Sequence, residues 1–146
     1  MSIPTAQAAS KQNAGYHAAG LVEDGMVVGL GTGSTVFFAM ERLGERIAKD
    51  GLSIAGVPTS YQAAIRARQY GIPLTSLDEH PGLDIAIDGA DQVDPDLHLI
   101  KGRGAALLRE KCVCDAADRV IIVVDPTKTV DILNAPVPVE VLPFAS

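Results

Sequence analysis

The sequence predicts an α/β fold in which helices alternate with the strands of a mostly parallel β-sheet. Short apolar runs recur between helical patterns along the chain, which is typical of βαβ units. The run Val-Ile-Ile-Val-Val at 120–124 contains no polar residue, as expected for a strand buried on both faces of a parallel sheet. The length of 146 residues fits one domain of ordinary size.

Each expected element follows from apolar periodicity and from the residues that end it. Helices show apolar residues at a spacing of three and four and end at glycines such as Gly51 and Gly71, whereas strands are short apolar runs. In chain order we expect a helix over 5–20, a strand over 26–30, a helix from 36 to 49, a strand over 52–57, a helix over 61–70, a short strand over 72–77, a strand over 83–87, a helix over 105–117 and the strand over 120–124. Residues 137–141 are expected to be extended, and the prolines there suit an edge or irregular strand.

Composition excludes several classes of protein. The net charge of -6 argues against nonspecific nucleic-acid binding, which needs a basic face. No apolar run approaches the roughly 20 residues of a membrane span, and residues 1–15 lack the features of a signal peptide. We therefore expect a cytoplasmic protein with no nucleic-acid or membrane partner.

The metal-ligating residue types are not arranged as ligands. His17, His80 and His98 are scattered, and Cys112 and Cys114 have no neighbouring Cys or His that would complete a zinc signature. The sequence predicts no metal site.

A glycine-rich loop between the first strand and the second helix is a candidate phosphate site. Gly31 allows a tight turn, the helix that follows offers free N–H groups, and hydroxyls add further donors. The residues concerned are Thr32, Gly33, Ser34 and Thr35. Ser34 stands where a dinucleotide fingerprint needs Gly, and no G-K-[ST] follows, so neither nucleotide motif is present. The alternative is an ordinary glycine-rich turn with a Ser/Thr helix cap.

Asp88 and Asp91 follow an apolar strand, at the end where open α/β sheets bind ligands. Two carboxylates there can hydrogen-bond hydroxyl groups or move protons. The alternative is a local turn, which Asp and Gly favour by themselves.

Lys101 precedes a second glycine-rich helix start, where its ammonium can meet anionic charge. Glu110 lies about two turns into that helix, between Arg109 and Lys111, which is the usual pattern of a solvated helix face.

The combination and order of these segments resemble the type A ribose-5-phosphate isomerases. The segments are Gly-Thr-Gly-Ser-Thr at 31–35, Asp-Gly-Ala-Asp at 88–91 and Lys-Gly-Arg-Gly-Ala-Ala-Leu-Leu-Arg-Glu-Lys at 101–111. Val120–Asp125 with Lys128, and Pro-Val-Glu-Val at 138–141, continue the resemblance in the same order.

The resemblance implies a Rossmann-like three-layer α/β/α catalytic domain over residues 1–135. Residues 136–146 would begin the connection to the small C-terminal α+β domain of the family, which this sequence lacks. The family interconverts ribose 5-phosphate and ribulose 5-phosphate in the pentose phosphate pathway without cofactor or metal, and its members are homo-oligomers, dimers or tetramers.

The same resemblance implies roles for individual residues. Glu110 would be the base that moves a proton between C2 and C1, and Lys101 would stabilise the anionic intermediate. Asp88 and Asp91 would contact the sugar, Asp88 also opening its ring. Substrate binding would involve residues 32–35, Gly102, Arg103, Gly104, Lys128 and Lys11. Many members carry Gly at the position of Arg103.

Two other functions stay open from the residues alone. The abrupt end at 144–146 and the missing C-terminal part would also fit a truncated, catalytically impaired sugar-phosphate-binding fragment. The glycine-rich loop would also fit a nucleotide-cofactor oxidoreductase, which Ser34 disfavours.

Overall fold

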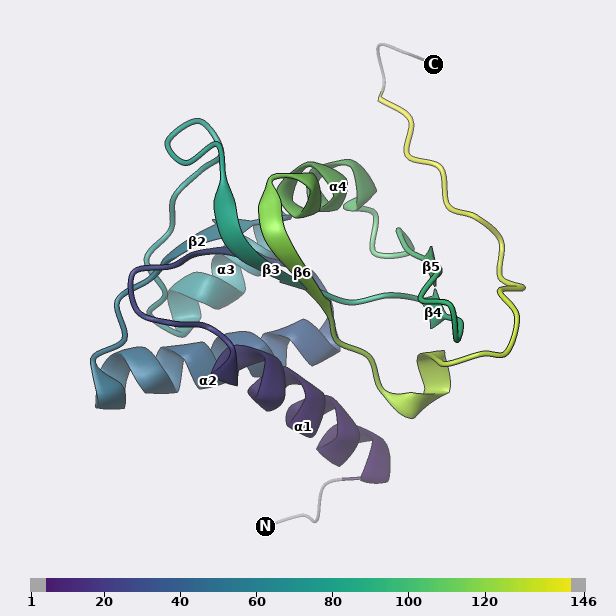
Figure 1. Ribbon diagram of the computed structural model, residues 1–146, viewed down its shortest axis with the longest axis horizontal. Coiled ribbons are helices and arrows are strands. Elements are labelled where there is room, and N and C mark those ends of the chain that lie inside the picture. Colours follow the sequence, from purple (N-terminus) through teal and green to yellow (C-terminus); the bar gives the residue numbers. More distant parts are fainter. Residues whose placement is uncertain (1–4, 143–146) are drawn as a thin grey trace.

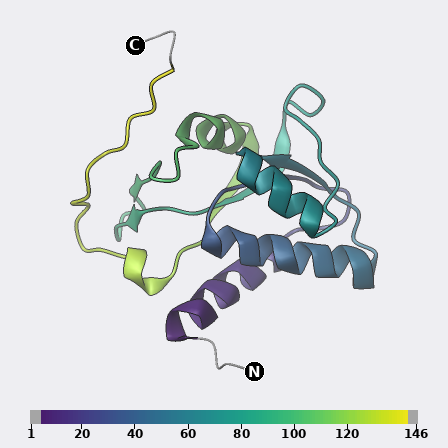
Figure 2. The same cartoon turned by 180° about the vertical axis from the view of Figure 1, so that it is seen from behind.

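The computed structural model describes residues 5–142, in which a four-stranded parallel sheet lies between helices (Figure 1). The strands are β1 Val27–Leu30, β2 Ala55–Pro58, β3 Leu83–Asp88 and β6 Ala117–Ile122, in the order β2-β1-β3-β6. Helices α1 Ala6–Gly20 and α2 Ser34–Asp50 cover one face, and α4 Leu107–Asp115 covers the other (Figures 1 and 2). Helix α3 Tyr61–Gln69 packs against β2 and α2. The predicted three-layer α/β/α arrangement is confirmed.

The strand order places a ligand site at the carboxyl ends of β1 and β3. The chain leaves β1 for β2 on one side and returns to β3 on the other, and both pair with β1 in parallel. Leu30 at the end of β1 lies opposite Ile87 of β3. Because the crossovers diverge between these strands, their loops leave a crevice at this edge of the sheet, as in other open α/β folds.

Two apolar clusters hold the layers together. The larger lies between the sheet and the α1–α2 layer and includes Leu30, Met40, Leu43 and Ile85, all at most 2% exposed. The smaller packs Val113 of α4 against the opposite face of the sheet. Helices α1 and α2 approach closely at Gly15, where an added Cβ would lie 2.7 Å from the Ala39 nitrogen and 2.8 Å from Phe38 Cβ.

Gly15→Ala is therefore expected to destabilise the protein by about 1–3 kcal/mol, the usual range for an overpacked site. The backbone and side chain of α2 stand where the methyl group would go, so the two helices must separate. The measurement is the free energy of unfolding in urea. Gly20→Ala, in the same helix but with nothing within 4 Å of its added Cβ, is the matched control and is expected to be neutral or slightly stabilising. Equal stability of both variants would contradict the close approach.

Several predicted elements differ in their bounds. Strand β2 begins at Ala55 rather than at 52, and residues 72–77 form only a bridge between Leu74 and Gly56. Helix α4 begins at Leu107 rather than at 105, because Ala105 has a φ of 54°.

The prediction that the last apolar run is buried on both faces was wrong. Strand β6 spans 117–122 and, among the described strands, pairs only with β3. Val120 is 41% exposed, because β6 lies at the edge of the sheet. The expected strand over 137–141 is not formed either. Its valines are exposed, and the segment runs as irregular chain (Figure 1).

A small antiparallel hairpin, β4 Gln92–Val93 and β5 Leu99–Ile100, follows β3 and was not predicted. The chain leaves the sheet after Ile122, and beyond residue 128 it runs along this hairpin, where the Gln92 side chain accepts from the Asn134 and Ala135 nitrogens. The abrupt end noted at residues 144–146 lies outside the described residues. Within those residues, none of the helices is both long and apolar enough to cross a bilayer.

Candidate active site

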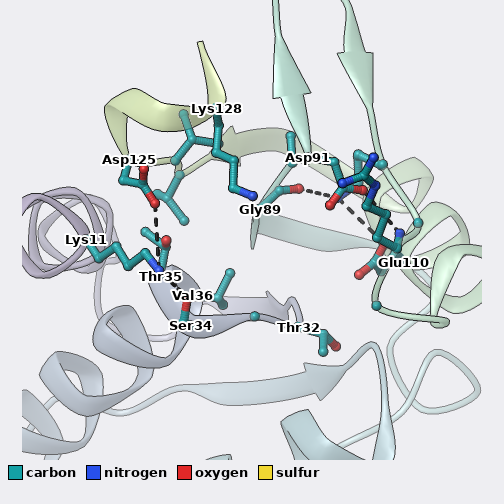
Figure 3. A pocket seen from close by; sticks show the side chains of 18 of the residues that line it. Lys11, Thr32, Ser34, Thr35, Val36, Gly89, Asp91, Glu110, Asp125 and Lys128 are labelled. Carbon is teal, nitrogen blue, oxygen red and sulfur yellow. Dashed lines mark hydrogen bonds and ion pairs between the residues drawn. The ribbon is translucent and has the colours of Figure 1, made fainter. Parts of the chain in front are cut away.

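A pocket of about 390 Å³ lies at the carboxyl ends of β1 and β3. It collects nearly all the residues singled out from the sequence: Lys11, Thr32, Gly33, Ser34, Thr35, Asp91, Lys101, Gly102, Arg103, Gly104, Glu110 and Lys128. Asp88 is the exception, since it lies beneath the lining. Figure 3 shows two ends to the pocket, with Lys11 and Lys128 at one and Asp91 and Glu110 at the other.

The glycine-rich loop passes directly against Asp88. The Gly31 nitrogen donates to the Ile87 oxygen at 2.9 Å, and a Cβ at Gly31 would lie 2.6 Å from the Asp88 carboxyl carbon. Only glycine allows the loop to come this close. Thr32 then donates its N–H to Asp88 Oδ1 at 3.3 Å.

The first turn of α2 forms one wall of the pocket. Gly33, with a φ of 132°, is the N-cap and provides no side-chain capping bond. The alternative of an ordinary Ser/Thr cap is therefore wrong, because Ser34 and Thr35 are already the first two helical residues. Since no cap side chain occupies them, the N–H groups of this turn are available to an anion.

Two lysines from distant parts of the chain border the same end. Lys11 of α1 donates to the Ser34 hydroxyl at 3.0 Å and lies 3.7 Å from Asp125 Oδ2. Lys128 ends the short 3-10 helix η1 Pro126–Lys128, and its side chain extends towards the middle of the pocket (Figure 3). Helix dipole, hydroxyls and two ammonium groups together make this end suited to a phosphate.

The other end is built around Lys101. Its ammonium donates to Asp88 Oδ2 at 2.9 Å and to the Gly89 oxygen, and lies 3.7 Å from Glu110 Oε2. Asp88 is 1% exposed, and its second oxygen accepts from the Gly89 nitrogen at 2.8 Å. Asp88 thus lies beneath the pocket lining and binds both Lys101 and the glycine-rich loop, whereas Asp91 lines the pocket itself.

Glu110 is 5% exposed, so the pattern of a solvated helix face was misleading. It lies in the first turn of α4 rather than two turns in, because the helix starts late. Burial, and next the negative charge of Asp88, raise the pKa of Glu110, while Lys101 opposes the shift. A buried carboxylate with a raised pKa is suited to accept a proton.

The loop that carries Arg103 is fixed from both sides. The Arg103 nitrogen donates to Asp91 Oδ2 at 3.1 Å, so the backbone of this residue makes the contact. At the end of the loop, α4 has Ala106 as its N-cap, with no side-chain cap bond of its own. Instead Glu140, from the returning chain, accepts from the Leu108 nitrogen at 2.6 Å.

Sequence reasoning missed Asp125, Gln7, Gln62 and the hydroxyl cluster of the neighbouring loop. Asp125 and Gln62 line the pocket with Gln7, and the Thr32 hydroxyl lies 2.9 Å from that of Thr59 and 2.7 Å from that of Ser60. Asp125 lies three residues beyond β6 and Asp88 is the last residue of β3, so both are at carboxyl ends of strands and the same positional signal was present. Gln7 and Gln62 lie on helices and gave no signal.

The chain matches one family along most of its length. The family model for ribose 5-phosphate isomerase A (phosphoriboisomerase A) matches residues 55–146. Ribose-5-phosphate isomerase A of Methanoregula boonei is 67% identical over 141 residues, which cover 97% of this chain and 59% of that protein. The Methanosarcina acetivorans protein of the same name is 56% identical, over 92% of this chain and 58% of its own length.

Solved structures agree with these matches. A D-ribose-5-phosphate isomerase in complex with phospho-erythronic acid superposes with a TM-score of 0.84 at 48% identity, over 87% of this chain and 56% of that chain. Ribose 5-phosphate isomerase A from Methanocaldococcus jannaschii superposes with a TM-score of 0.81 at 44% identity, over 84% of this chain and 55% of its own. This chain thus spans less than two thirds of the length of these relatives, and it belongs to the ribose 5-phosphate isomerase A family.

Proposed function

We propose that this chain carries the site that interconverts D-ribose 5-phosphate and D-ribulose 5-phosphate. The observation that carries the proposal is the buried Glu110 carboxylate, 3.7 Å from the Lys101 ammonium, across a pocket from a helix N-terminus flanked by lysines. The relatives described above have this activity in their names, which supports the same assignment here.

In the proposed reaction, Glu110 removes the proton from C2 of the open-chain aldose. The electrons form a C1–C2 double bond, and the C1 carbonyl oxygen becomes the oxyanion of an enediolate. A proton moves from the C2 hydroxyl to this oxygen, and Glu110 returns its proton to C1, which leaves a ketone at C2. A positioned base of this kind contributes about 10²–10⁴-fold.

Lys101 is the cation for the enediolate oxygens, and one such preorganised donor is worth about 3–4 kcal/mol. Asp88 keeps the Lys101 ammonium in place through a 2.9 Å hydrogen bond. Because the Asp88 carboxylate is occupied by Lys101, it does not contact the sugar directly. Asp91 borders the pocket and is the better placed of the two acids to meet sugar hydroxyls. If Asp88 assists ring opening, it acts by way of Lys101.

The end of the pocket opposite Glu110, called the phosphate end below, binds the phosphate of the substrate. Ser34, Thr35 and the N–H groups of the first turn of α2 supply donors, and Lys11 and Lys128 supply charge. This anchor fixes the position of C2 against Glu110, which converts binding energy into orientation. Thr32, Gly33, Gly102, Arg103 and Gly104 complete the walls.

The proposal extends to the whole protein in the terms that the resemblance implies. Residues 1–135 form the catalytic domain, and 136–146 begin the connection to a further α+β domain. The active protein is a cytoplasmic homo-oligomer, a dimer or tetramer, that needs neither metal nor cofactor.

Turnover of ribose 5-phosphate by this chain, with ketose formation followed directly, tests the proposal. Turnover would establish the activity. Thermal stabilisation by phospho-erythronic acid without turnover would indicate a sugar-phosphate-binding fragment instead. If the chain shows no turnover and no stabilisation, the result contradicts the proposed site in this chain. A titration with NADH that showed binding would favour an oxidoreductase.

Lys128→Met is expected to raise KM for ribose 5-phosphate about tenfold while kcat changes little, because in this proposal Lys128 pairs with the phosphate and Lys101 with the reacting carbons. Steady-state kinetics at fixed ionic strength measure both constants. The matched control is Lys49→Met, at the far end of α2, which should change neither. A fall in kcat with unchanged KM would place Lys128 at the reacting end instead.

A further inference from the structure

We propose that Asp125 is a positioning residue that holds the two lysines of the phosphate end in their binding arrangement. The inference rests on the proposed function, and it adds a residue to which neither the sequence motifs nor the mechanism above gives a role. It starts from an apparent contradiction: a carboxylate lines a pocket that is otherwise built to receive an anion.

Asp125 is buried and has partners on both oxygens. The residue is 1% exposed, and Oδ1 accepts from the nitrogen of Thr127 at 2.9 Å and also from its hydroxyl. Oδ2 accepts from Gln7 Nε2 at 3.4 Å and lies 3.7 Å from Lys11 Nζ. Burial alone would raise the pKa of Asp125, but the Thr127 hydrogen bonds hold it below the ordinary value, so the group is ionised at neutral pH.

The carboxylate connects the two lysines, which come from opposite parts of the sequence. On one side it forms the ion pair with Lys11, whose ammonium also reaches the Ser34 hydroxyl at 3.0 Å. On the other side it is the N-cap of η1, the short helix that ends at Lys128. One buried group therefore holds the Lys11 ammonium directly and fixes the backbone of the turn that carries Lys128 before a ligand arrives, which lowers the entropy lost on binding.

Two physical effects of Asp125 on an anion oppose each other, and this makes the inference testable. By charge alone, a carboxylate near a phosphate repels it, so removal of the charge should tighten binding. By positioning, removal of the charge frees Lys11 and weakens the cap of η1, so binding should weaken. We expect the second effect to dominate, because the ion pair already offsets the negative charge locally.

The test is isothermal titration of the chain with ribose 5-phosphate and, separately, with inorganic phosphate, well below the unfolding temperature of every variant. Asp125→Asn keeps the size of the side chain and is expected to bind both ligands about tenfold more weakly, a difference of 1.4 kcal/mol. Asp118→Asn, on the exposed part of β6, makes the same charge change away from the pocket and should leave affinity unchanged.

A double-mutant cycle identifies the route of the effect. If Asp125 acts through Lys11, Asp125→Asn should weaken binding less in a Lys11→Met background than in the unmodified chain. Thr127→Val, which alters neither the carboxylate nor a lysine, should produce a smaller loss of the same sign. It also keeps the test decisive if Asp125→Asn folds poorly.

Equal or tighter binding by folded Asp125→Asn would overturn the inference, as would full additivity in the cycle together with unchanged binding by Thr127→Val. Failure of the proposed function gives a different result. In that case the unmodified chain would bind inorganic phosphate but not ribose 5-phosphate, and the Asp125 effect on phosphate would persist. Binding of neither ligand by the unmodified chain would overturn both.

Discussion

Glu110→Gln is expected to lower kcat for isomerisation by about 10²–10⁴-fold, with little change in KM. The amide keeps the shape of the side chain in its buried position but cannot take a proton from C2. A coupled assay of ketose formation measures kcat, and titration with phospho-erythronic acid verifies that the pocket still binds. Exposed Glu23→Gln is the control. Turnover retained in Glu110→Gln would remove this residue from the role of base.

The same substitution is expected to raise thermal stability at neutral pH. The folded-state pKa of Glu110 lies above its unfolded value, chiefly because of burial. The native protein therefore binds the proton more tightly than the unfolded chain, and ionisation above the folded pKa costs stability. Gln is neutral at every pH and avoids this cost. A melting temperature lowered by Glu110→Gln at neutral pH, with no such fall in acid, would show that the ionised carboxylate is net stabilising instead.

The pH dependence of turnover should report the same shift. Since the base must be ionised, kcat/KM in the active protein should fall on the acid side with an apparent pKa above about 4.3, the ordinary value for Glu. A profile of kcat/KM against pH measures it. An acid limb at or below the ordinary value would mean that the Lys101 charge outweighs burial.

Lys101→Met is expected to have the second largest effect, on stability as well as on turnover. Asp88, 1% exposed, would lose the ammonium that lies 2.9 Å from its Oδ2. Removing one partner of a buried ion pair costs about 3–5 kcal/mol, and the partial exposure of Lys101 places the expected loss near the lower figure. Urea unfolding measures it, and kcat should fall as the oxyanion loses its cation.

The double variant Asp88→Asn/Lys101→Met separates the two contributions. It removes the charge of Asp88 together with that of Lys101, so much of the stability should return while turnover stays low. The part that does not return is due to Glu110, whose carboxylate lies 3.7 Å from the lost ammonium. If Lys101→Met is as stable as the unmodified chain, Asp88 does not depend on this lysine, and the construction of this end of the site as described above is wrong.

The parallel sheet and its helices were predictable because short apolar runs and helical spacings are local signals. The failures came where position in the sheet mattered. The run at 120–124 looks fully buried from composition, but the number of its neighbours follows from strand order, which local sequence does not encode. The start of α4 depended on the positive φ of Ala105, which propensity alone does not predict.

The site was predictable as a set of residue types, and less so as a geometry. Asp88, Lys101 and Glu110 were found through motif order, yet spacing alone favoured a solvated Glu110. Its burial results from the packing of α4 on the sheet. Asp125 was missed because its partners, Lys11 and Gln7, lie more than 100 residues away, and no local pattern joins them.

The contact between α1 and the turn after β6 also sets an order of events during synthesis. The residues of the phosphate end come from positions 7–11, 32–35 and 125–128, and those around Glu110 lie between the second and third of these segments. A nascent chain that has formed β1, β2 and β3 can pack its helices but has no completed anion site until Asp125 is available. Phosphate ligands should therefore stabilise only folding states in which residues 125–128 are already in place. Phosphate protection would then serve as a reporter of the step in which the turn after β6 packs against α1.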